Sequence, residues 1–182
     1  MAQVYTAEID LRTYMERYRD APFFMGLCKQ CRNFGSVWAC PPFDFDVEAR
    51  LGQFENVLIV AYRCPLPDGN HSVDEAMDLL RPDKEELANN LLELENEVGG
   101  LACGFGGKCP HCRKCARLKG EKCLHPDKVR PAVEAYGFDV GKTVSELLGI
   151  DIEWAKDGRL PKTLTLMAAL FHNQPQGTIS FK

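Results

Sequence analysis

The segment KCPHCRKCARLKGEKCLHPDKVR, residues 108–130, places four cysteines in one short loop, and the rest of the chain is interpreted outward from it. Three of the cysteines have the spacing C-x2-C-x2-C. This spacing lets thiols converge on one centre without a strained backbone, as in the loops that hold iron-sulfur clusters. We therefore interpret the loop as a metal site whose ligands are Cys109, Cys112, Cys115 and Cys123.

The identity of the metal has two main alternatives. Bacterial ferredoxins continue after three residues to a fourth cysteine followed by proline, whereas here the gap from Cys115 to Cys123 is longer and the proline is Pro126. Zinc accepts four thiolates, or thiolates with one imidazole from His111 or His125. Ligand softness and spacing favour a 4Fe-4S cluster over zinc, and unmetallated thiols are the third reading.

The loop is strongly basic. Eight basic residues stand against two acidic ones, a balance of +6 in a chain whose net charge is -4. Nearby cations favour deprotonated thiols and tune the potential of an anionic cluster. A solvated loop, or a patch for nucleic acid or an acidic partner, would have the same composition. The basic residues are Lys108, Arg113, Lys114, Arg117, Lys119, Lys122, Lys128 and Arg130.

A second cysteine group lies in FFMGLCKQCRNFGSVWACPPFDFD, residues 23–46, with the spacing C-x2-C-x8-C. The C-x2-C pair is a common ligand pair, and the two prolines after the third cysteine fix the backbone there. We predict a second centre held by Cys28, Cys31 and Cys40, with Cys64 or Cys103 as fourth ligand or with an open iron. Alternatively, Cys40 completes the set of Cys109, Cys112 and Cys115, as a remote Cys-Pro does in ferredoxins.

Length and composition indicate one compact domain over residues 1–182, with cysteine-rich segments 28–42 and 103–126. No apolar run approaches the roughly 18 residues of a membrane span, and the N-terminus lacks a signal-like pattern. Nine cysteines, an odd number without a secretory signal, favour metal ligation over disulfides. We expect a soluble cytoplasmic protein. The pI of about 5.6 makes general nucleic-acid binding a weak default and leaves only the basic loop for it.

Periodicity and capping signals predict an α/β or α+β fold with a central mixed sheet flanked by helices. Helices are expected after the capping residues Asp10, Asp46, Ser72, Asp83 and Thr143, and residues 124–137 should be helical in part. Strands are expected at residues 57–64, 101–103, 164–171 and 178–181. Cys64 is interpreted as a core thiol in preference to a spare ligand, because free cysteines are usually buried. His71 and His172 are interpreted as surface histidines, without a nucleophile arrangement nearby.

The combined motifs resemble a known family. They are C-x2-C followed by WACPP, then CPxCxxC, then CxHP at residues 123–126, and RPAVEAYGFDV at residues 130–140. Together they are similar to a family of small cysteine-rich bacterial and archaeal proteins described as predicted metal-binding proteins of unknown function. The resemblance covers most of the chain. It implies metal binding, with an iron-sulfur cluster as the expected form, in prokaryotes that often live anaerobically.

Three functions remain open from the sequence. The first is an iron-sulfur protein with one or two 4Fe-4S clusters that serves a redox partner in electron transfer or as an enzyme accessory. The second is a zinc-stapled module that binds nucleic acid or an acidic protein through the basic loop. The third is a cluster enzyme with an open iron, which predicts that four aromatic residues line a pocket beside it: Phe34, Trp38, Phe43 and Phe45.

Overall fold

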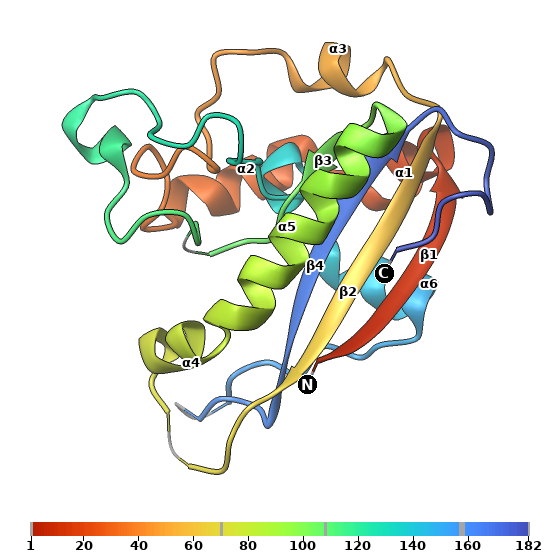
Figure 1. The fold of residues 1–182 in the computed structure, drawn as a ribbon. Helices are drawn as coiled ribbons and strands as arrows, with labels where there is room; N and C mark the ends of the chain where they lie inside the picture. The colour runs from red at the N-terminus through yellow and green to blue at the C-terminus, as the bar shows by residue number, and fades with distance from the viewer. Residues whose placement is uncertain (1, 70, 108, 157–158, 182) are drawn as a thin grey trace.

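A computed structural model describes residues 2–69, 71–107, 109–156 and 159–181, and its centre is a four-stranded sheet (Figure 1). The strand order is β1-β2-β4-β3, and every neighbouring pair is antiparallel. The strands are β1 (Gln3–Asp10), β2 (Asn56–Pro65), β3 (Leu101–Cys103) and β4 (Thr163–His172). The helices are α1 (Leu11–Tyr18), α2 (Ala21–Gln30), α3 (Val47–Leu51), α4 (Val73–Leu79), α5 (Arg81–Val98) and α6 (Val140–Leu148), with short 3-10 turns η1 (Ala116–Lys119) and η2 (Glu134–Tyr136).

Strand β2 is buried on both faces and divides the hydrophobic core in two. Val57 and Ile59 point into one cluster with α1 and α6, while Leu58 and Val60 point into the other with α5. This alternation is the two-residue period of a strand whose two faces are both covered. Figure 1 shows α5 across one face of the sheet and α1 and α6 behind it.

The predicted fold class is confirmed, and the pairing of the strands refines it. A mixed sheet was expected, but the four strands pair only in antiparallel fashion. A parallel neighbour needs a crossover connection, and here α5 leads to β3, which pairs antiparallel to β4. The architecture is therefore the α+β alternative.

Several predicted helix starts are confirmed by their caps. The Asp10 side chain accepts from the Thr13 N–H at 2.9 Å, and Asp46 caps α3 in the same way. Ser72 and Glu75 form the capping box of α4. Two starts were wrong. α5 begins at Arg81 with proline in its first turn and no side-chain cap, and α6 begins at Val140 with Asp139 as its cap.

Some elements differ from the sequence-based expectation more strongly. β1 and α2 were not predicted, and α2 carries Pro22 in its first turn, a position that tolerates proline. Residues 124–137 contain only the short turn η2, because two prolines limit regular structure there. Residues 178–181 do not form the predicted strand. Within the described residues, the helices include none long and apolar enough to cross a membrane.

His172 is a correction to the surface role predicted for it. It is fully buried at the end of β4, with Nε2 3.4 Å from Oε1 of Glu8 on β1. His71 is half-buried in a loop, with Nε2 3.1 Å from the carbonyl oxygen of Pro67. The apolar residues before His172 continue the pattern of β4, so its burial follows from the length of the strand.

Burial of His172 makes the stability of the fold depend on pH. Desolvation lowers the pKa of His172 below its ordinary value of 6.5, although the Glu8 carboxylate opposes the shift. Below pH 6.5 the unfolded chain therefore binds a proton that the folded chain resists, so the free energy of unfolding should fall as the pH decreases from 6.5. Urea denaturation between pH 7.5 and 5.5 measures this. His172→Gln should flatten the dependence, and an equal slope in both proteins would contradict the assignment.

Candidate metal centre

The first cysteine group lies where α2 ends and the following loop folds back. Cys28 is in the last turn of α2, and the N–H of Cys31 donates to the Cys28 carbonyl at 3.0 Å. The Cys40 N–H donates to the Val37 carbonyl at 3.0 Å, just before a cis peptide bond joins Pro41 and Pro42. Helix end and proline step together position the three thiols of Cys28, Cys31 and Cys40, which we name the first group.

The pKa values of Cys28 and Cys40 are raised chiefly by burial, with other thiols of the first group as further causes. Burial raises the pKa of Cys40 to about 12, and the charges of Cys31 and Cys28 add to the shift while Arg117 opposes it. Burial likewise raises the pKa of Cys28, with Cys31 as the next cause. Since a metal ion offsets both burial and repulsion between thiolates, deprotonation in the first group would be favoured when metal binds.

The second group, Cys109, Cys112, Cys115 and Cys123, lies in the loop around η1. All four thiols are half-buried. Burial raises the pKa of Cys109, and the other three members of the group add to the shift. Burial raises the pKa of Cys112, and the charges of Cys123 and Cys115 add to the shift. The four predicted ligands thus lie in one short loop, while Lys108, counted among its basic residues, lies outside the described part of the chain.

The structure places the two groups beside each other. Cys40 neighbours Cys28 and Cys31, and it also lines a small cavity of about 40 Å³ with Cys109. The assignment of Cys40 to the first group and its alternative assignment to the second therefore both stay predictions. Among the described residues, no three His, Cys, Asp or Glu side chains already converge on a position for a single ion.

The two further candidate ligands lie in the hydrophobic core. Cys64 is on β2 in the cluster covered by α5, on the opposite face of the sheet from Cys103. Burial raises its pKa to about 12, as expected for the core thiol that the sequence favoured. Cys103 ends β3 and is fully buried, and this burial raises the pKa of its thiol, with the charge of Glu134 as a lesser cause. The structure does not bring Cys64 to the first group.

The two candidate histidine ligands lie next to each other within the second cysteine segment. The ring centres of His111 and His125 are 6.2 Å apart. Burial lowers the pKa of His111, which favours the neutral imidazole that a metal requires. The backbone N–H of His125 donates to the Cys123 sulfur at 3.4 Å. A hydrogen bond of this kind stabilises a thiolate, so residue 125 contributes to the site through its backbone.

Arg117, which the sequence did not single out, joins the two cysteine segments. Its guanidinium donates to the carbonyl oxygens of Val37 at 2.9 Å, Cys40 at 2.6 Å and Pro42 at 2.6 Å. It also lies 4.7 Å from the centre of the Trp38 ring, and the Trp38 indole N–H donates to the Glu121 carbonyl at 3.1 Å. The two loops, far apart in sequence, are therefore held together by one planar cation and one aromatic ring.

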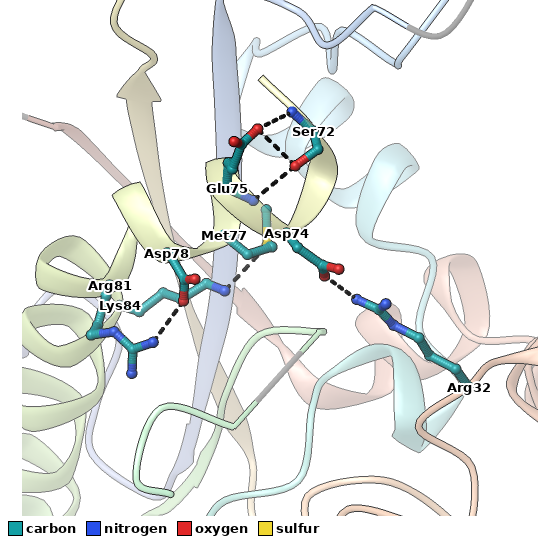
Figure 2. A network of polar contacts seen from close by, with 8 residues as sticks. All are labelled: Arg32, Ser72, Asp74, Glu75, Met77, Asp78, Arg81 and Lys84. Atoms are coloured by element: carbon teal, nitrogen blue, oxygen red, sulfur yellow. Dashed lines mark hydrogen bonds and ion pairs between the residues drawn. The ribbon is translucent and has the colours of Figure 1, made fainter. Parts of the chain in front are cut away.

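A cleft of about 580 Å³ runs between the two cysteine segments and α4. Cys31 of the first group borders it together with all four thiols of the second group. Figure 2 shows the α4 wall, where Arg32 forms a 2.8 Å ion pair with Asp74 and so ties α4 to the first cysteine segment. On the same wall, Lys84 donates to the Met77 sulfur at 3.2 Å (Figure 2). The wall is thus held in place by side chains from three segments.

The four aromatic residues expected beside an open iron do not share one location. Trp38 lines the cleft. Phe43 and Phe45 stack with ring centres 4.9 Å apart and pack against Tyr136 in the core. Phe34 is half-buried. Of the four aromatic residues, all of which the structure describes, Trp38 is the one that lines the cleft. The predicted aromatic pocket is therefore wrong for Phe43 and Phe45, because the turn after the proline pair directs them to the sheet.

Some basic side chains of the loop bind other groups of the protein. Arg130 forms a 2.6 Å ion pair with Glu95 on α5 and donates to the carbonyls of Asp127 and Val129. Arg117 binds carbonyls as described above. The exposed members of the basic set are Arg113, Lys114, Lys119, Lys122 and Lys128. A partner surface on this loop stays a prediction.

Fold and site together define a cysteine-rich α+β protein in which Cys31 of the first group and all four thiols of the second group border one cleft. Residues 16–171 match the DUF2284 family of predicted metal-binding proteins, and the chain belongs to that family. This confirms the resemblance drawn from the cysteine motifs. The chain matches no curated protein and no solved structure.

Proposed function

We propose that this protein is a cytoplasmic iron-sulfur protein that serves in electron transfer or as an accessory to a redox enzyme. The second group would hold one 4Fe-4S cluster and the first group a second centre. The observation that carries the proposal is that five half-buried or exposed thiols, Cys31 of the first group and all four of the second group, line one cleft. Soft thiolates in loops of this spacing suit iron-sulfur clusters.

The chain's own residues contribute position and electrostatics to such a centre. Arg117 holds the Cys40 carbonyl and its neighbours in place, and the His125 N–H supports the Cys123 sulfur. Hydrogen bonds to cluster sulfurs and nearby cations raise a cluster's reduction potential. When bound, the cluster would supply one-electron chemistry. The exposed basic residues around it would favour an acidic redox partner.

The first measurement is metal and acid-labile sulfide content of protein purified without oxygen, with an ultraviolet-visible spectrum. We expect about four or eight iron per chain with matching sulfide, and a broad visible absorption that bleaches on reduction. Zinc at about one or two per chain without sulfide would contradict the proposal. That result would support instead a zinc-stapled module that binds nucleic acid or an acidic protein through the basic loop.

The cleft favours a second candidate, a cluster enzyme acting on a small molecule. A volume of about 580 Å³ lies within the range of small-molecule sites, and one wall carries thiols of both groups. A centre with only three protein ligands could bind a substrate directly at its open iron. Leu118→Ala, which changes an exposed side chain lining the cleft, would then weaken substrate binding, whereas an electron-transfer protein would keep its redox potential.

A further inference from the structure

Glu134 lies where three segments of the site meet. The turn η2, which begins at Glu134, packs against α2, and the Asp20 N–H donates to the Gly137 carbonyl at 2.9 Å. Two residues before Glu134, the Ala132 N–H donates to the Ala39 carbonyl at 3.1 Å. These contacts place Glu134 between the helix that carries Cys28 and the loop that carries Cys40.

The Glu134 side chain is half-buried, and one of its carboxylate oxygens has no hydrogen-bond partner among the described residues. Oε1 lies over Gly106 so closely that a Cβ at this glycine would come within 2.7 Å of it. Oε2 is buried, and among the described residues nothing donates a hydrogen bond to it. A buried carboxylate oxygen without a donor is costly unless a cation or a proton satisfies it. Oε2 would be satisfied by a proton, which burial favours by raising the pKa of Glu134, or by a bound cation.

A metal at the first group would be such a cation. The packing of η2 against α2 and the hydrogen bond from Ala132 to Ala39 bring Glu134 to the segments that carry Cys28 and Cys40, and after burial its charge is one of the causes that raise the pKa of both thiols. Cys64, one alternative donor, lies on the other face of the sheet. Cys103, the other, is enclosed in the apolar cluster with Tyr14 and Phe138. Neither offers the first group an unpartnered anionic atom.

We propose that Glu134 supplies the fourth protein donor, through Oε2, to the metal centre at Cys28, Cys31 and Cys40. The inference rests on the proposed metal-binding function and adds a ligand to it. A carboxylate oxygen is a harder donor than a thiolate, so the iron that it binds is held less firmly than an iron held by cysteine. The first centre would then have one labile iron at the position next to Glu134.

The test compares Glu134→Gln, Glu134→Cys and Cys103→Ala with the wild-type chain, all purified without oxygen. Glutamine keeps the shape of the side chain and removes its charge, and cysteine restores an anionic donor. We expect Glu134→Gln to lose iron from the first centre on air exposure at least about tenfold faster than wild type. Electron paramagnetic resonance should show the three-iron product. Glu134→Cys should recover four irons, and Cys103→Ala should match wild type.

Each outcome separates this inference from the proposed function. If wild type contains two clusters but Glu134→Gln keeps wild-type iron content, spectrum and air stability, Glu134 is not a ligand and the function still stands. Loss of iron in Cys103→Ala alone would likewise overturn the inference. A wild-type chain with zinc and no sulfide would overturn the function, and unchanged zinc retention in Glu134→Gln would then overturn the role of Glu134 as well. A chain without metal overturns both.

Discussion

Alanine at Cys112 is expected to remove the iron held by the second group and to leave the first centre in place. With two clusters, the iron content should fall from about eight to about four per chain, with sulfide in proportion. Cys112 is chosen because its electrostatic neighbours are Cys123 and Cys115, members of the same group. The measurement is iron and sulfide on protein purified without oxygen, supported by the resonance spectrum of the reduced sample.

The corresponding variant in the first group, Cys31→Ala, should remove the iron of the first centre and leave the spectrum of the second cluster. Cys40→Ala then decides between the two partitions of the cysteines. If it reproduces the spectrum of Cys31→Ala, Cys40 belongs to the first group, and if it reproduces that of Cys112→Ala, it completes the second. Cys64→Ala is the matched control, because this thiol is buried on the far face of the sheet and its loss should leave all iron bound. Complete loss of iron in both Cys31→Ala and Cys112→Ala would contradict two separate centres.

The parts of the fold that were predicted correctly are those with local signals. β2 is an apolar, β-branched run, and α1, α3 and α4 begin at side chains that cap their first N–H groups. β1 was missed because it is an edge strand with several exposed positions, so its apolar pattern is weak. α2 was missed because none of its residues is fully buried, which removes the periodic signal of a packed helix.

The spacing of the cysteines predicts two groups because ligands within a short loop are brought together by the chain itself, and this grouping stays a prediction. The contacts of Arg117 and the position of Glu134 could not be predicted from the sequence. Arg117 acts on carbonyls about 75 to 80 positions earlier in the chain, and nothing in the segment CARLK indicates that contact. Glu134 gave a faint signal, a single acid inside the apolar run PAVEAYG, but its meaning depends on α2 and Gly106, which only the fold brings to it.

Replacing Arg117 by alanine is expected to separate the two cysteine segments. Three carbonyl oxygens lose a charged donor at once, and each such hydrogen bond contributes roughly 1.5 to 3 kcal/mol in favourable cases. Because the site is only partly buried and water can replace some donors, we expect a loss of about 2 to 4 kcal/mol in the free energy of unfolding. Urea denaturation measures this loss.

The fluorescence of Trp38 reports locally on the separation of the two segments in Arg117→Ala. The Trp38 ring stacks on the guanidinium of Arg117, whereas the second tryptophan, Trp154, is 75% exposed, so a Trp154→Phe background isolates the signal of Trp38. Acrylamide should quench Trp38 more strongly in Arg117→Ala.

Arg117→Lys should recover part of the stability, since an ammonium group cannot reach all three carbonyls in the plane of a guanidinium. Arg113→Ala, which removes an exposed cation from the same loop, should stay within about 0.5 kcal/mol of wild type. If Arg117→Ala and Arg113→Ala are equally stable and equally quenched, the two segments stay together without Arg117. The sheet and α2 alone would then hold the two thiol groups near each other.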